Sequence, residues 1–99
     1  MQKLADITFK DNQFFIAGEL NFFNVMSLFQ KSLPQLQQYR ELHFNFSELK
    51  SSDSGGLALI MEWIKFAKQQ NKAIYFTHLS KDILSLAKAA GLDSLISAK

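Results

Sequence analysis

The feature that most limits how this chain can fold is the strict alternation of apolar and polar residues in ELHFNFS, residues 41–47. Successive side chains of a strand point to opposite faces of the sheet. One face of this strand carries Leu42, Phe44 and Phe46, and the other face is polar. A strand buried between two layers of helices is apolar on both faces. The alternation therefore indicates a sheet that helices cover mainly on one face, with the other face open to solvent or to a partner.

Strand and helix patterns alternate along the rest of the chain. We expect strands at 7–10 and 13–20, a helix at 24–39, the strand at 41–47, a helix at 55–71, a strand at 73–79 and a helix at 81–90. The first two strands are joined by an Asp11-Asn12 turn, and Pro34 is expected to kink or end the first helix near Leu33. Strands separated by helices pair in parallel. The sequence thus predicts a single α/β domain over residues 1–99, with the order ββαβαβα and a mixed, mostly parallel sheet.

Composition excludes several classes of protein. The 99 residues contain no cysteine, and the formal net charge is only +2. The lysines are scattered and form no stripe that would follow a phosphate backbone, so we expect no nucleic-acid partner. No apolar run reaches the ~20 residues that cross a bilayer. We expect a cytoplasmic protein with no metal and no cofactor.

The segment SSDSGGLALIMEW, residues 51–63, leads from serines and glycines directly into the longest expected helix. A nucleophilic Ser54 would need a base within hydrogen-bond reach. The two histidines, His43 and His78, both lie in expected strands, and the G-x-S-x-G pattern of a nucleophile elbow is absent. We therefore expect no enzymatic activity.

The same loop has two further interpretations at the level of local structure. Either Asp53 or Ser54 can cap the helix, and Gly55 and Gly56 then let its first turn pack closely against the sheet. Free backbone N–H groups at a helix start also suit an anion. The loop contains no lysine and no P-loop pattern, which disfavours a nucleotide site.

The helix at 55–71 carries more apolar surface than one face of a sheet requires. Leu59, Trp63 and Phe66 lie further round the helix than the residues of the natural core face. Either neighbouring helices cover these side chains, or they form a docking patch with Trp63 as its anchor.

The element order, the segment GELNFFNV (18–25) and the segment SSDSGGLALI (51–60) together resemble the STAS domain family over residues 7–92. The second segment is similar to the D-[ST]-x-G-L loop that begins the long helix of that family. The resemblance implies one of two functions. Anti-sigma-factor antagonists bind a serine-kinase anti-sigma factor and are switched off by phosphorylation in this loop. MlaB-like subunits dock on the ATPase of an ABC transporter that moves phospholipids and maintains outer-membrane lipid asymmetry.

The loop sequence distinguishes the two branches. Antagonists typically read D-S-S-G-L, and that alignment places Gly55, which has no hydroxyl, at the phosphate-accepting position. Transporter subunits typically read D-[ST]-G-G-L-A, which residues 53–58 match. The resemblance therefore implies a non-catalytic accessory subunit whose Ser54 contacts the transporter ATPase. The alternative is an anti-sigma-factor antagonist regulated by phosphorylation in the 51–56 loop, where Ser54 is the candidate acceptor.

This interpretation defines an expected site and its partners. The partner is the ATPase and, through it, the permease, so the protein would sit at the inner membrane without inserting into it; an isolated copy could also form a homodimer. The expected docking loop is Ser52, Asp53, Ser54, Gly55 and Gly56. The expected docking patch beside it is Leu57, Leu59, Trp63, Phe66, Lys81 and Ser85.

Overall fold

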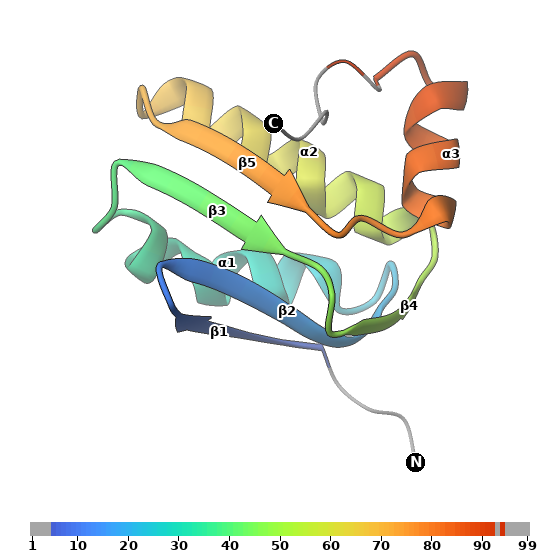
Figure 1. The fold of residues 1–99 in the computed structure, drawn as a ribbon, viewed down its shortest axis with the longest axis horizontal. Coiled ribbons are helices and arrows are strands. Elements are labelled where there is room, and N and C mark those ends of the chain that lie inside the picture. Colours follow the sequence, from blue (N-terminus) through green and yellow to red (C-terminus); the bar gives the residue numbers. More distant parts are fainter. Residues whose placement is uncertain (1–4, 93, 95–99) are drawn as a thin grey trace.

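The computed structural model describes residues 5–92 and 94 (Figure 1). Among these residues, no helix is both long enough and apolar enough to cross a bilayer. The elements in chain order are β1 (Asp6–Lys10), β2 (Gln13–Leu20), α1 (Val25–Leu36), β3 (Glu41–Asn45), β4 (Leu49–Ser52), α2 (Ser54–Gln69), β5 (Ala73–Thr77) and α3 (Lys81–Ala89).

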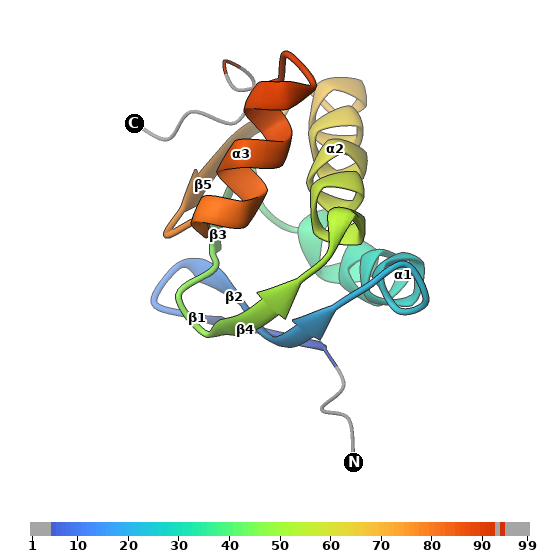
Figure 2. The same cartoon turned by 90° about the vertical axis from the view of Figure 1, so that its right-hand side faces the viewer.

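The sheet is mixed, as the sequence predicts. Its strands run in the order β1-β2-β3-β5, with β1 antiparallel to β2 and the other neighbours parallel. Figure 2 shows α1 and α2 together on one side of the sheet, with α3 beside α2. The opposite face carries half-buried side chains such as Phe15, and His43 stacks there on Tyr75 with ring centroids 4.7 Å apart. The prediction of a sheet covered mainly on one face is confirmed.

The strand β4 is not predicted by the sequence. It pairs in parallel with the end of β2, where Leu20 lies opposite Ser52, and the register shifts between Gly18 and Glu19. The observed order is therefore ββαββαβα. The four residues LKSS show no alternation of their own, so only the pairing with β2 makes them a strand. This strand ends at Ser52 and leads the chain directly to Asp53 and the start of α2.

Two element boundaries also differ from the sequence prediction. The helix α1 continues through Pro34 to Leu36. Proline removes the N–H that would bond the carbonyl of Gln30, and because Gln30 is exposed, water can replace that donor. Strand β5 ends at Thr77, and His78 adopts a positive φ of 59°, which takes the chain out of the sheet before α3.

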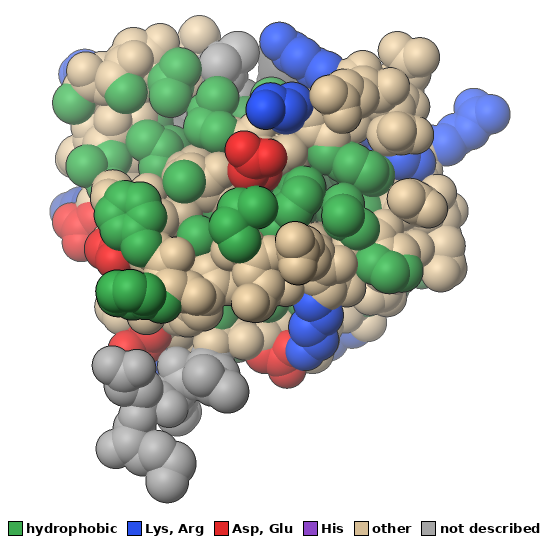
Figure 3. Space-filling model, turned by 180° about the vertical axis from the view of Figure 1, so that it is seen from behind, with side chains coloured by type: hydrophobic (Ala, Val, Ile, Leu, Met, Phe, Trp, Pro, Cys, Tyr) green, Lys and Arg blue, Asp and Glu red, His purple; other side chains and the backbone are tan. Residues whose placement is uncertain are grey.

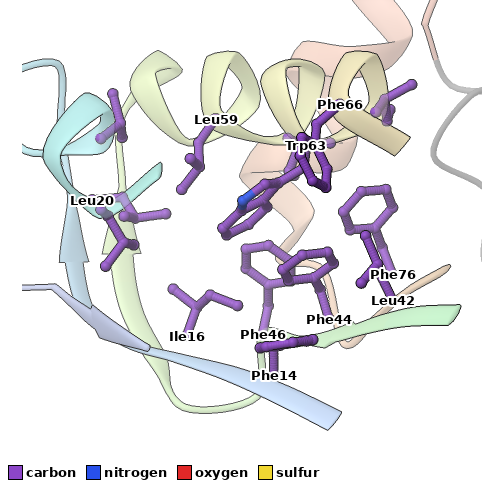
Figure 4. Close-up of a cluster of buried hydrophobic side chains, with 14 of the residues drawn as sticks. Phe14, Ile16, Leu20, Leu42, Phe44, Phe46, Leu59, Trp63, Phe66 and Phe76 are labelled. Atoms are coloured by element: carbon purple, nitrogen blue, oxygen red, sulfur yellow. The ribbon is translucent and has the colours of Figure 1, made fainter. Parts of the chain in front are cut away.

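The core is an aromatic cluster between the sheet and α2 (Figure 4). The indole of Trp63 stacks on the ring of Phe44 with centroids 4.0 Å apart, and Phe44 stacks in turn on Phe14 and Phe76. The indole nitrogen of Trp63 donates a hydrogen bond to the hydroxyl of Ser32 on α1, at 3.1 Å. This bond satisfies the one polar atom that burial of the indole would otherwise leave without a partner.

The expectation that Leu59, Trp63 and Phe66 belong to a docking patch is wrong, because all three are core residues. Trp63 has no exposed surface. The helices α1 and α3 both contact α2, so α2 is covered from the sheet and from two sides. Of the alternatives for the surplus apolar surface, burial by neighbouring helices is the correct one. Leu57, which belongs to the expected patch, and Met61 are the half-exposed apolar residues of α2.

Candidate protein-docking surface

The 51–56 loop is built around the carboxylate of Asp53, which caps α2. One carboxylate oxygen accepts the N–H of Gly55 at 2.7 Å, and the Asp53 carbonyl accepts the N–H of Gly56 at 3.0 Å and the hydroxyl of Ser52 at 2.8 Å. Asp53, and not Ser54, is therefore the helix cap. Because these bonds already occupy the N–H groups of both glycines, the loop is poorly suited to cradle a phosphate.

The side chain of Ser54 lies at the surface and does not cap α2. Ser54 is the first residue of α2 and is exposed, and its hydroxyl forms no hydrogen bond within residues 5–92 and 94. His43 lies on the open face of the sheet, where its ring nitrogen pairs with Glu41 at 3.2 Å. Within the same residues, neither His43 nor His78 hydrogen-bonds Ser54. The Ser54 hydroxyl therefore lies on the surface of the described part of the chain without a hydrogen-bond partner there.

Gly55 fits the loop because no side chain can stand at its position. A Cβ built on Gly55 would lie 2.8 Å from the carbonyl carbon of Asn21 and 2.9 Å from the nitrogen of Phe22. Both are backbone atoms of the β2–α1 loop, which cannot move aside as a flexible side chain could. Gly56 is similarly close to the hydroxyl of Ser52. Gly55 therefore lets the 51–56 loop lie tightly against the β2–α1 loop, and Gly56 lets Ser52 lie close to the first turn of α2.

The β2–α1 loop presents two phenylalanines to solvent, which the sequence analysis misses. Phe22 is 63% exposed and Phe23 is 95% exposed. The side-chain oxygen of Asn21 accepts the N–H groups of Phe23 and Asn24, at 2.8 and 3.1 Å. The amide of Asn24 spans the loop, accepting from the Asn21 N–H and donating to the Glu19 carbonyl. The signal in the sequence is the pair of asparagines that brackets FF, because asparagine favours such local turns.

Apolar side chains also gather on the outer face of the helix layer, as Figure 3 shows. The exposed or half-exposed residues are Met26, Phe29 and Leu33 on α1 and Leu57 and Met61 on α2. Of the expected patch, Leu57 remains available here, and Lys81 and Ser85 are exposed on α3. The start of α3 lies against the loop, because a Cβ on Gly56 would be 3.5 Å from a methyl group of Ile83. An exposed hydroxyl, a rigid loop and adjoining apolar surface together suit binding to another protein.

The fold and the loop define a family. The family model described as "Mlab, STAS domain" matches residues 5–97, and this chain therefore belongs to the STAS domain family.

Two relatives of similar sequence are both anti-sigma-B factor antagonists. The chain is 28% identical over 86 residues to an anti-sigma-B factor antagonist of Bacillus subtilis (strain 168), covering 87% of this chain and 79% of the relative. It is 29% identical over 82 residues to an anti-sigma-B factor antagonist of Staphylococcus epidermidis, covering 82% and 76%. Among solved structures, the unphosphorylated anti-sigma factor antagonist SpoIIAA superposes with a TM-score of 0.70 at 17% identity, over 94% of this chain and 85% of that chain. This last likeness confirms the fold.

Proposed function

We propose that this protein is a non-catalytic regulator of the anti-sigma-factor antagonist type, which binds an anti-sigma factor through the 51–56 loop. The names of the curated relatives supply the class of partner. The observation that carries the proposal is the Ser54 hydroxyl, which is exposed and has no hydrogen bond among the described residues, on a loop that Asp53 and Gly55 hold in place. A preformed loop binds with little loss of conformational freedom.

Regulation by phosphorylation would act on Ser54 in this proposal. Gly55 offers no hydroxyl, and its position has no room for one. A phosphate on Ser54 would be stabilised by the N-terminal end of the α2 dipole and opposed by the neighbouring carboxylate of Asp53. The fold would tolerate the group, but its bulk and charge would stand in the docking surface and block the partner.

A second candidate partner is the ATPase of a phospholipid-transport ABC complex. The description of the matching family model and the D-S-G-G-L-A form of residues 53–58 favour it. So does the packing of Gly55, because a loop closed to any side chain at that position suits constitutive docking better than a switch there. In this case the protein is a subunit on the cytoplasmic side of the inner membrane and docks on the ATPase without entering the bilayer.

The test is recovery of the tagged protein from its own host in mild detergent, with the bound proteins identified by mass spectrometry. Wild type is compared with Ser54→Glu, which adds charge at the proposed contact and stays compatible with the helix start. Gln69→Glu is the matched control, because it adds the same charge at the exposed far end of the same helix.

Each result assigns the function. An anti-sigma factor that wild type and Gln69→Glu recover and Ser54→Glu loses supports the antagonist proposal. An ABC ATPase with its permease, showing the same dependence on Ser54, supports the second candidate and overturns the first. Equal recovery by all three variants would mean that the 51–56 loop is not the docking site.

A further inference from the structure

We propose that Phe22 and Phe23 are the anchor of this docking surface, inserting into an apolar pocket of the partner protein that has an arginine or lysine at its rim. The inference rests on the proposed docking function. It adds the residues that supply most of the affinity and the chemistry of the partner surface that receives them.

The exposed apolar area of the pair is large for so short a loop. Phe22 is 63% exposed and Phe23 is 95% exposed. A phenylalanine buries roughly 150–250 Å² when fully covered, so the pair offers on the order of 300 Å² of apolar surface. A standard interface buries roughly 800 Å² on each partner. Two adjacent side chains would therefore supply more than a third of one side, which is how interface hot spots are concentrated.

The loop holds these side chains outward by specific hydrogen bonds. Asn21 and Asn24 satisfy the N–H groups of Asn21, Phe23 and Asn24 and the carbonyl of Glu19 within the loop itself. Because Gly55 has no side chain, the first turn of α2 packs directly against the Asn21–Phe22 peptide. The exposed rings thus stand on a fixed backbone, and a partner that receives them has little ordering entropy to overcome.

The surface beside Phe23 is hollowed as well as apolar. The hollow has a volume of about 240 Å³ and is lined by Ala5, Phe23, Asn24, Ser27, Leu28 and Lys31. A projecting ring next to a recess gives an interlocking shape that a flat lipid surface does not match. The Lys31 ammonium in this lining is already paired with the carboxylate of Asp6, at 2.7 Å.

Charge at the base of the loop favours a protein pocket over a membrane. A Cβ on Gly55 would lie 2.8 Å from both the Asp53 carboxylate and the Asn21 carbonyl carbon. The carboxylate therefore adjoins the β2–α1 loop, which carries Phe22 and Phe23 and is called the phenylalanine loop below. Asp53 is exposed, and it forms no ion pair within residues 5–92 and 94. A carboxylate beside the rings attracts a cationic side chain of a partner and is repelled by anionic lipid headgroups.

The experiment measures the affinity of purified variants for the partner that the recovery experiment identifies. Phe22→Ser and Phe23→Ser are compared with Leu86→Ser, which removes an apolar side chain that is 37% exposed on α3. We expect each phenylalanine variant to bind on the order of tenfold more weakly or worse, and the control to bind within about twofold of wild type. Asp53→Asn keeps the helix cap while removing the charge, and we expect weaker binding with a reduced dependence on salt.

A photocrosslinking residue, benzoylphenylalanine in place of Phe23, then locates the receiving surface. Crosslinks to apolar residues around a recess bordered by arginine or lysine support the inference, and crosslinks to a polar or acidic surface overturn it. Two further results overturn the anchor. One is loss of binding in Ser54→Glu with unchanged binding in both phenylalanine variants, which leaves the docking function intact. The other is retention of wild type, but not Phe23→Ser, on phosphatidylcholine vesicles containing phosphatidylglycerol, which would make the loop a membrane contact.

Discussion

Two groups of aromatic residues in this protein are built in opposite ways. In the core, Phe44 and Trp63 stack with centroids 4.0 Å apart and have no exposed surface. In the β2–α1 loop, Phe22 and Phe23 stand side by side in the chain and project into solvent. Burial of the first pair stabilises the fold, whereas the second pair keeps its apolar area available for another molecule.

The difference comes from the backbone that carries each group. Core rings stand on strands and on α2, where the period of the element directs them to the sheet–helix interface. The loop rings stand on a turn held by Asn21 and Asn24, whose side chains replace the hydrogen bonds that a regular element would supply. An aromatic residue therefore shows its role only once its supporting backbone is known.

The largest expected effect separates the two groups by stability. Trp63→Ala removes a fully buried indole that stacks on Phe44 and hydrogen-bonds Ser32. We expect a loss of about 3–5 kcal/mol in the free energy of unfolding. Phe23→Ala removes a ring with few internal contacts and should change that free energy by no more than about 0.5 kcal/mol. Urea denaturation followed by circular dichroism measures both.

Trp63→Phe serves as the control for this pair of variants. It keeps an aromatic ring over Phe44, while the Ser32 hydroxyl retains its bond to the Phe29 carbonyl. The loss should therefore be clearly smaller than for Trp63→Ala. Equal losses for Trp63→Ala and Phe23→Ala would show that the loop pair is part of the fold and not a surface kept for binding.

The sequence predicts most of the fold because its strands and helices have clear periods. The alternation around Leu42 and Phe44 correctly predicts a sheet with one open face. The strand β4 is missed because the segment LKSS has no strand pattern of its own. It is a strand only because it pairs with β2. Local periodicity cannot reveal such a long-range pairing.

The site is predicted only in part, because the exposure of a side chain depends on elements that are distant in the sequence. The 51–56 loop is recognisable because serines, an aspartate and two glycines precede an apolar helix. The docking patch around Trp63 is wrong because a helical wheel does not contain α1 and α3, which flank α2. Phe22 and Phe23 are missed because the flanking asparagines indicate a turn but do not show whether the rings on it are exposed or buried.

The contact between Gly55 and the base of the phenylalanine loop gives the next prediction. Gly55→Ala would place a methyl group within 3 Å of backbone atoms of Asn21 and Phe22. Overpacking of this kind costs about 1–3 kcal/mol, and the gain of alanine over glycine in a helix interior, roughly 1 kcal/mol, reaches only the lower end of that range. We expect a net loss of stability, and also weaker partner binding, because the loop must shift.

Gly91→Ala is the matched control for that steric effect. Gly91 has a φ of 74°, and among residues 5–92 and 94 nothing lies within 4 Å of a Cβ built there, so alanine meets conformational strain but no described neighbour. We expect a cost of about 1 kcal/mol and unchanged partner binding. If Gly55→Ala were neutral in both measurements, the close packing of the two loops would not be what fixes the phenylalanines.

The cap of α2 predicts a smaller effect. Asp53→Ala removes the carboxylate that accepts the Gly55 N–H at 2.7 Å and should destabilise the protein by about 1 kcal/mol. Asp53→Asn retains an acceptor and should cost only a few tenths of that amount. Thermal unfolding of the two variants measures the difference. Equal losses for asparagine and alanine would mean that charge, and not capping, is what Asp53 supplies to the fold.

The smallest effect on stability is expected at the residue with the largest proposed role in the docking loop. Ser54→Ala removes a hydroxyl that is exposed and forms no hydrogen bond among the described residues, so the free energy of unfolding should change by no more than about 0.5 kcal/mol. Binding should nevertheless weaken, because the hydroxyl is available only to a partner. Urea denaturation and an affinity measurement on the same preparation separate the two effects. A loss near 1 kcal/mol with unchanged affinity would instead identify Ser54 as part of the helix cap, and the docking surface would then reduce to the phenylalanine loop and its apolar surroundings.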